Sequence, residues 1–211
     1  MSRTLEVTPE TGPIVPLLGP KEVILTFDDG PHRSRTVSVL NVLASQCVTA
    51  TFFVQGDNSR RHPAVVRAIV ENGHSVGGHS MTHRNLALLP LEEGMKDALD
   101  GVTATDAALG EVGATRLFRF PFVASTPELS SVLKSAGLIE IGVTVDGKDW
   151  TDNGAGEIVD IIMAGLEAGP GRGTVLLHDP FDHSEQATRL LLRRLKDEGY
   201  EIVALKVAED D

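Results

Sequence analysis

Short apolar runs alternate with segments of helical spacing along most of the chain. Runs rich in Val, Ile and Phe, each short enough for a strand, occupy residues 22–27, 49–55, 74–77, 116–120, 138–145, 174–178 and 201–206. Between them, apolar residues recur at helical intervals at about 35–46, after Pro63, at about 91–109, after Thr126, at 156–167 and at 184–198. This alternation predicts an α/β domain with a mostly parallel sheet.

The start of the chain lacks this pattern. Residues 1–20 are rich in proline and show little periodicity, which predicts an N-terminal arm before one domain over 21–211. They contain no apolar run typical of a signal peptide, and no stretch reaches the ~20 apolar residues of a membrane helix. We expect a cytoplasmic protein as written, or an exported one whose signal has been removed.

The charge balance narrows the classes of partner. The chain has 19 Lys and Arg against 30 Asp and Glu, a formal net charge of −11. That balance argues against a nucleic acid or an anionic membrane surface as the main partner. The single cysteine, Cys47, excludes an internal disulfide and a cysteine-built zinc site.

Polar clusters follow the carboxyl ends of most predicted strands. In chain order they are Asp28–Asp29, His79 with His83, Arg119 to Phe122, Asp149–Trp150 and His178–Asp179. In parallel α/β folds, ligands bind at that edge of the sheet. An open sheet gathers only a few loops at its switch point, whereas a barrel brings all of them around one mouth. The convergence of these clusters therefore favours a barrel.

The two histidines of the HSMTH segment are spaced for a metal. His79 and His83 are four residues apart, and a carboxylate at a strand end would complete a catalytic zinc site with open positions. The same ligand set fits the facial triad of non-haem iron oxygenases. The adjacent aspartates 28 and 29 favour hydrolysis, because attack by water needs a base beside the metal. His178, at another strand end, is placed to protonate a departing amine.

Taken together, these segments resemble a known family. TFDDGP at 26–31, HSMTH at 79–83, RFPF at 119–122, DW at 149–150 and LLHD at 176–179 occur in the order of the polysaccharide deacetylase family. This family is the NodB-homology domain of carbohydrate esterase family four, and the similarity covers roughly 21–206. The resemblance implies a deformed (β/α) barrel of about seven parallel strands. It also implies one divalent metal, most often zinc, with cobalt or nickel as alternatives.

The resemblance also implies a role for each motif residue. The implied metal ligands are Asp29, His79 and His83. The implied catalytic residues are Asp28 as general base, His178 as general acid, Arg119 and Asp149 as the residues that hold and tune them, and Phe122 through its backbone N–H in the oxyanion hole. The implied substrate contacts are Trp150, Phe122 and Leu176. Three positions depart from the family pattern: Gly78, Phe122 and Val123 replace the usual asparagine, tyrosine and glycine.

The function implied is removal of N-acetyl groups from glycans that contain N-acetylglucosamine, such as chitooligosaccharide, peptidoglycan or an exopolysaccharide. An O-deacetylase acting on acetylated xylan and a non-catalytic glycan-binding relic are the alternatives. With 4% aromatic residues, we expect the chain to grip only one or two sugars. The remaining histidines, His32, His62, His74 and His183, are expected at the surface or in loops, and Asp179 is expected to be a structural turn residue.

Overall fold

A curled parallel sheet forms the centre of the protein, whose computed structural model describes residues 3–208. Every strand pair within the sheet is parallel. The strands follow the order β6 (Ile139–Glu140), β5 (Leu117–Phe118), β4 (Ser75–Gly78), β3 (Thr51–Val54), β2 (Glu22–Asp28), β8 (Gly173–His178) and β7 (Val145–Asp146), with β9 (Glu201–Ile202) beside β2. This arrangement confirms the predicted deformed (β/α) barrel of about seven parallel strands.

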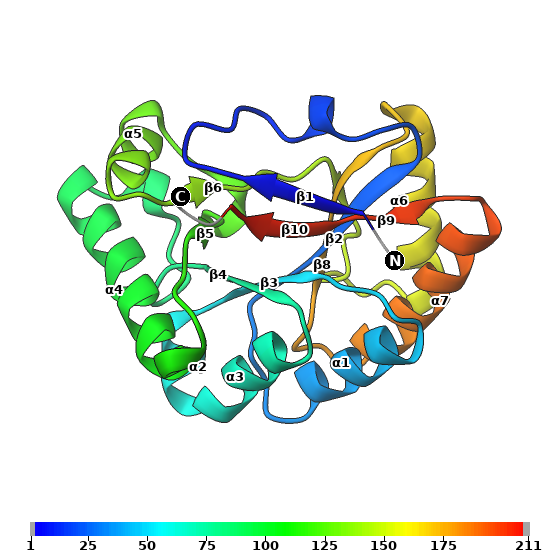
Figure 1. Ribbon diagram of the computed structural model, residues 1–211, viewed down its shortest axis with the longest axis horizontal. Coiled ribbons are helices and arrows are strands. Elements are labelled where there is room, and N and C mark those ends of the chain that lie inside the picture. The colour runs from blue at the N-terminus through cyan, green and yellow to red at the C-terminus, as the bar shows by residue number, and fades with distance from the viewer. Residues whose placement is uncertain (1–2, 209–211) are drawn as a thin grey trace.

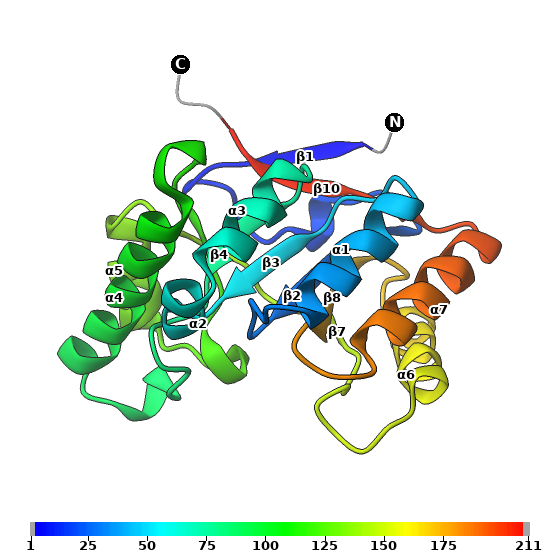
Figure 2. The same cartoon turned by 90° about the horizontal axis from the view of Figure 1, so that it is seen from below.

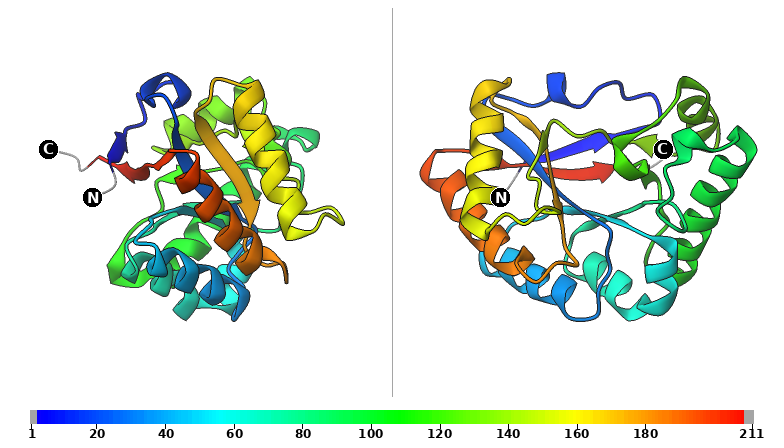
Figure 3. Two further views of the ribbon diagram at one scale, coloured as in Figure 1. Left: turned by 90° about the vertical axis from the view of Figure 1, so that its right-hand side faces the viewer. Right: turned by 180° about the vertical axis from the view of Figure 1, so that it is seen from behind.

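Helices surround the outer face of this sheet (Figures 1 and 3). They are α1 (Arg35–Ser45), α2 (Gly56–Arg61), α3 (Pro63–Glu71), α4 (Leu91–Leu109), α5 (Pro127–Ser135), α6 (Ala155–Ala168) and α7 (Ser184–Asp197). Within the described residues, four short 3₁₀ turns lie between the strands and helices: η1 (Val15–Leu17), η2 (Leu86–Leu88), η3 (Gly110–Val112) and η4 (Pro121–Val123). Seen from below, α1 and α3 cross β2 and β3 (Figure 2). The short helix α2 was not predicted.

The alternation of side chains along β2 separates the outer core from the barrel interior. Val23, Leu25 and Phe27 are fully buried in the cluster that also holds apolar residues of α1, α3, α6 and α7. Ile24 belongs instead to the interior cluster. Because side chains two apart share a face, Asp28 points to the same side as Ile24. Burying each large apolar side chain contributes roughly 1.5–3 kcal/mol, so the strand's orientation is firmly set.

The predicted strand at 138–145 is two strands. β6 and β7 lie at opposite ends of the sheet order, and residues 141–144 cross between them. The Ile141 N–H donates to the Phe118 carbonyl, whereas the Thr144 N–H donates to the Thr174 carbonyl on the other side. The stretch looks like one strand because Ile139 and Ile141 are buried in the interior cluster and Val145, four residues further on, is buried in the outer one, so hydrophobicity alone did not reveal the break.

The N-terminal arm contains a strand that the sequence did not predict. β1 (Thr4–Val7) pairs in parallel with β10 (Ala204–Val207), and the two form a separate small sheet (Figure 1). Leu5 and Val7 are buried in the interior cluster. The strand is only four residues long, too short for its alternation to stand out. No helix within residues 3–208 is both long and apolar enough to cross a membrane.

Candidate active site

The two adjacent aspartates reach one site because the chain turns between them. Asp28 is the last residue of β2 and is almost fully buried, whereas Asp29 adopts the left-handed conformation with φ of 72°. A Cβ on Gly30 would overlap the carboxylate of Asp179, so only glycine fits the turn. His79 Nε2 then lies 3.7 Å from Asp28 Oδ2 and 3.5 Å from Asp29 Oδ1.

Asp29, His79 and His83 form a cluster that can hold a metal ion. One ligand atom from each lies within 4.8 Å of the others, and His83 Nε2 is 3.1 Å from Asp29 Oδ1. His79 Nδ1 lies 2.8 Å from the Arg119 carbonyl oxygen, which fixes this nitrogen as the donor and leaves Nε2 free. Burial lowers the pKa of His79 to about 3, so the imidazole is neutral, as a ligand must be. These three side chains therefore suit a divalent cation.

Arg119 holds Asp28 in the barrel interior. Its NH1 donates to Asp28 Oδ1 and to Thr26 Oγ1, both at 2.7 Å, and its Nε donates to the Ile141 carbonyl at 3.1 Å. The guanidinium carbon also lies 4.2 Å from the centre of the Phe53 ring. Burial raises the pKa of Asp28 above its ordinary value, although the charge of Arg119 opposes this. The carboxylate is thus held in place yet disposed to accept a proton.

Asp149 holds His178, the last residue of β8, much as Arg119 holds Asp28. Its Oδ1 lies 2.7 Å from His178 Nδ1, and its Oδ2 accepts the His178 backbone N–H at 2.7 Å. Burial acts to lower the pKa of His178, but the hydrogen bond and charge of Asp149, together with the charges of Asp28 and Asp29, raise it to about 9. His178 is therefore protonated at neutral pH, with Nε2 3.9 Å from Asp29 Oδ2.

Comparison with known proteins agrees with this geometry. The family model for polysaccharide deacetylase matches residues 18–141. A chitooligosaccharide deacetylase of Sinorhizobium fredii is 35% identical over 161 residues, which are 76% of this chain and 73% of the relative. The chain belongs to the polysaccharide deacetylase family. This confirms the predicted resemblance and the classification as a hydrolase of the carbohydrate deacetylase type.

Two further proteins similar to this chain are longer than it. The peptidoglycan-N-acetylmuramic acid deacetylase PdaC of Bacillus subtilis is 33% identical over 90% of this chain, which spans 39% of that protein's length. A peptidoglycan deacetylase of Bdellovibrio bacteriovorus superposes with a TM-score of 0.89 at 28% identity, over 99% of this chain and 60% of that one. This deacetylase domain is therefore shared with longer proteins of the family.

A cavity of about 330 Å³ opens over the cluster of this deacetylase. It is lined by Asp28, Asp29, His79, His83, Phe122, Val123, Asp146, Trp150, Leu176 and His178. All three predicted substrate contacts are among them: Leu176 is buried, while Phe122 and Trp150 remain 62% and 58% exposed. The Phe122 ring packs 4.8 Å from that of His83, and Phe122 and Val123 both have positive φ, 60° and 53°.

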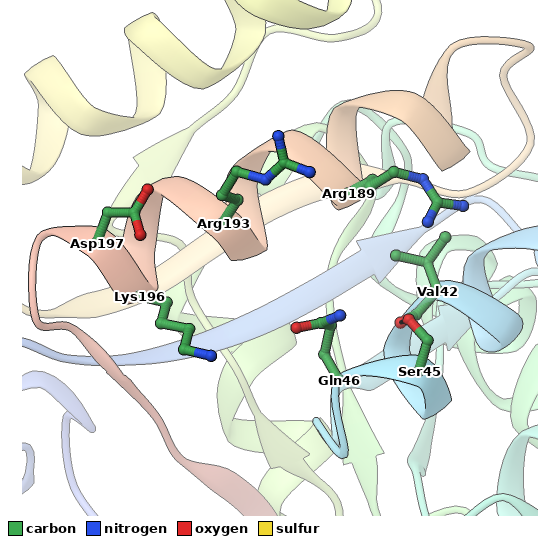
Figure 4. A pocket seen from close by; sticks show the side chains of 7 residues that line it. All are labelled: Val42, Ser45, Gln46, Arg189, Arg193, Lys196 and Asp197. Atoms are coloured by element: carbon green, nitrogen blue, oxygen red, sulfur yellow. Dashed lines mark hydrogen bonds between the residues drawn. The ribbon is translucent and has the colours of Figure 1, made fainter.

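A second hollow, of about 370 Å³, lies on the outer surface between α1 and α7 (Figure 4). Its side chains are Val42, Ser45, Gln46, Arg189, Arg193, Lys196 and Asp197. Among these described residues there is no histidine and one carboxylate, so this hollow has no catalytic constellation. The side chains capable of acid–base and metal chemistry line the cavity at the strand ends instead.

Sequence reasoning missed Gln55 and Asn58. Gln55 Nε2 donates to Asp29 Oδ1 at 2.9 Å, and Asn58 Nδ2 donates to the Asp29 carbonyl at 2.9 Å. Gln55 follows β3 directly, so it stands at the carboxyl end of a strand like the residues that were predicted. Its position at a strand end could therefore have identified Gln55 from the sequence.

His74 and His183 lie in loops, as predicted, but neither side chain is fully exposed. His74 is buried, with Nδ1 accepting the Ala50 N–H at 3.2 Å and its ring 5.5 Å from that of Phe52. It is buried because it lies directly before β4 and its ring packs against Phe52 of the outer core. His183 is half-buried. Its Nε2 lies 2.9 Å from the carbonyl oxygen of Asp149, the residue that also holds His178.

Asp179 is fully buried at the end of β8. It accepts a hydrogen bond from the Thr36 hydroxyl and packs against Gly30. Burial raises its pKa to about 7. These contacts agree with the predicted structural role in the turn.

Proposed function

We propose that this protein is a metal-dependent N-deacetylase acting on glycans that contain N-acetylglucosamine. One observation carries the proposal: the metal-capable cluster of Asp29, His79 and His83 lies between a carboxyl disposed to accept a proton, Asp28, and an imidazolium, His178. Hydrolysis of an amide by water needs a base, an electrophile and an acid around one cavity.

Asp29, His79 and His83 would hold the ion. When bound, a divalent cation such as zinc polarises the acetyl carbonyl and lowers the pKa of water. Asp28 accepts the proton of the attacking water, and Arg119 keeps its carboxylate directed at the cavity. The raised pKa of Asp28 makes it a stronger base than an exposed aspartate.

His178 completes the reaction on the other side of the cavity. Its Nε2–H protonates the sugar nitrogen as the C–N bond breaks, and Asp149 keeps Nδ1 as the fixed donor. Water supplies one oxygen of the released acetate and the acetyl carbonyl supplies the other, and the products are acetate and a free amino sugar. The backbone N–H of Phe122 stabilises the developing oxyanion, a contribution of roughly 3–4 kcal/mol per donor in comparable sites.

The protonated state of His178 favours an amide over an ester substrate. An amine is a far poorer leaving group than an alcohol unless it is protonated, so an acid that stays charged at neutral pH is most useful for N-deacetylation. O-deacetylation of acetylated xylan by the same residues remains the alternative function.

The cavity offers no surplus of positive charge. The carboxylates of Asp28, Asp29 and Asp146 line it, and the positive charge of the His178 imidazolium and of a bound divalent cation would only balance them. A sugar bearing a carboxylate, such as N-acetylmuramic acid, would therefore find no unpaired cationic side chain among the residues that line the cavity. We therefore propose N-acetylglucosamine units rather than N-acetylmuramic acid units as the substrate.

A substrate panel tests this proposal. Purified protein with added zinc is incubated with chitotetraose, acetylated xylan and a glycan rich in N-acetylmuramic acid, and the released acetate is measured. The proposal predicts the highest kcat/KM for chitotetraose. Release from xylan alone would establish the O-deacetylase, and faster release from the muramic acid glycan would overturn the charge argument. Tight glycan binding without acetate release from any of the three would identify the non-catalytic relic.

A further inference from the structure

One face of α4 lies against the turn that carries His83. Asp97, Gly101 and Thr105 are four residues apart on this helix and therefore share a face. The turn begins at His79, the residue that follows β4, and reaches His83 through Ser80, Met81 and Thr82. None of the three α4 residues lines the cavity.

The carboxylate of Asp97 binds the middle of this turn. Its Oδ1 accepts the backbone N–H of Met81 at 2.9 Å and of Thr82 at 3.2 Å, and its Oδ2 accepts the Thr82 hydroxyl at 2.6 Å. The Met81 N–H also donates to the Asp97 carbonyl at 2.9 Å. Partial burial acts to raise the pKa of Asp97, but the hydrogen bonds from Thr82, Met81 and Ser80 outweigh it and lower the pKa. Asp97 is therefore a charged anchor for the turn.

The same turn is fixed from other sides. The N–H groups of Gly56 and Asp57, at the start of α2, donate to the carbonyls of Ser80 at 2.9 Å and Met81 at 3.1 Å. Gly101 approaches so closely that a Cβ on it would overlap the Ser80 carbonyl group. The carbonyl groups of the turn thus accept hydrogen bonds from α2, and the N–H groups of the turn donate hydrogen bonds to Asp97 on α4. The two helices hold the turn between them.

The turn needs such support because its backbone is strained. Ser80 and His83 both adopt the left-handed conformation, with φ of 58° and 57°. For residues other than glycine this conformation is unfavourable and persists only where the surroundings impose it. The surroundings here include the hydrogen bonds of Asp97 to the two residues between the strained positions.

The two histidine ligands are held unequally. His79 follows β4 directly, and its Nδ1 is fixed by the Arg119 carbonyl. For His83 the structure gives a backbone N–H bond to Ser80 Oγ at 3.0 Å, ring contacts with His79 and Phe122, and a distance of 3.1 Å from Nε2 to Asp29 Oδ1. Its direction depends on the turn, so a change in Asp97 should displace His83 more than His79.

We propose that Asp97 is a positioning residue for the metal site, acting through Met81 and Thr82 on the direction of His83. The inference rests on the proposed metal-dependent function. It assigns to α4 a task that no sequence motif indicated, because Asp97 lies 14 residues beyond His83 within an ordinary amphipathic helix.

Zinc affinity is the quantity that tests it. The metal-free wild type, Asp97→Ala and Asp97→Asn are titrated with zinc against a chromophoric chelator, and the cobalt forms are compared by visible absorption. Loss of a residue that orients a metal ligand typically weakens the metal by about 10–100-fold. We expect that loss for Asp97→Ala, a smaller one for Asp97→Asn, and an altered cobalt spectrum in both. Asp100→Ala, on the same helix but paired with Lys96, is the matched control and should bind zinc like the wild type.

A double-mutant cycle separates positioning from general stability. If Asp97 acts through His83, Asp97→Ala should cost zinc affinity in the wild type and little or nothing more in a His83→Ala background. Equal costs in both backgrounds would overturn the proposal. Thr82→Val, which removes only the hydroxyl bond from an exposed residue, covers the case in which Asp97→Ala fails to fold, and should weaken zinc several-fold.

The outcomes distinguish this inference from the proposed function. A wild type that binds neither zinc nor cobalt would overturn the metal-dependent function and this inference with it. A wild type that binds zinc, with Asp97→Ala and Thr82→Val binding it equally tightly, would overturn the positioning role alone.

Discussion

The buried His74 makes the stability of the metal-free protein depend on pH. Burial, assisted by the charge of Lys206, lowers the pKa of His74 to about 4. In the unfolded chain the imidazole titrates near its ordinary value of about 6.5. Between these values only the unfolded chain binds the proton, so the stability present above pH 6.5 is lost as the pH falls towards 4.

The size of the loss follows from the two pKa values. A difference of about 2.5 pKa units corresponds to about 3.4 kcal/mol once both states are protonated. At pH 5 the loss is already about 2 kcal/mol, whereas at pH 7.5 it is below ~0.1 kcal/mol. Native stabilities are about 5–15 kcal/mol, so this single residue should be visible in an unfolding curve.

Urea unfolding of wild type and His74→Leu at pH 7.5 and pH 5 isolates this contribution. Carboxyl groups titrate in both proteins and cancel in the difference between them. We expect the wild type to lose about 2 kcal/mol more than His74→Leu between the two pH values. Lys206→Met should reduce the extra loss, because it removes the second cause of the shift. An equal pH dependence in wild type and His74→Leu would refute the reasoning.

Further predictions concern the residues around the site. Asp149→Asn removes the charge that raises the pKa of His178, so the alkaline limb of kcat/KM for acetate release should move to lower pH; an unchanged profile would count against His178 as the acid. Arg119→Met leaves Asp28 buried without its cation and should lower the free energy of unfolding by about 3–5 kcal/mol in urea titrations, so a loss below ~1 kcal/mol would be inconsistent with the buried pair. Val123→Gly relieves about 1–2 kcal/mol of left-handed strain against about 0.5–1 kcal/mol of added chain entropy, so thermal unfolding should show a net gain of about 0.5–1 kcal/mol rather than a loss.

The sequence predicted those parts of the site that strand ends determine. Carboxyl ends of neighbouring parallel strands meet at one edge, so polar residues at the carboxyl ends of β2, β4 and β8 had to lie close together. Asp28, His79 and His178 were identifiable for that reason. The same rule covered Gln55 after β3, but an amide has no acid–base or typical metal chemistry, and it was passed over.

Features that depend on three-dimensional contacts were not predictable from the pattern. The break between β6 and β7 lies inside an apolar run, and only the hydrogen-bond partners of Ile141 and Thr144 place the halves on different strands. His74 looks like a loop histidine until Phe52 and Ala50 are seen to surround it. Asp97 is one of many acidic residues on a helix, and its role follows from the turn that packs against it.

Acetate release from chitotetraose, before and after chelation and zinc addition, tests the central claim most directly. Asp28→Asn is measured alongside, since it keeps the shape of the side chain beside Arg119 but cannot accept the proton, with Asp100→Asn as the control. The account predicts release that chelation abolishes, zinc restores and Asp28→Asn lacks by at least ~100-fold. Release that persists in Asp28→Asn, or that survives complete removal of metal, would contradict it.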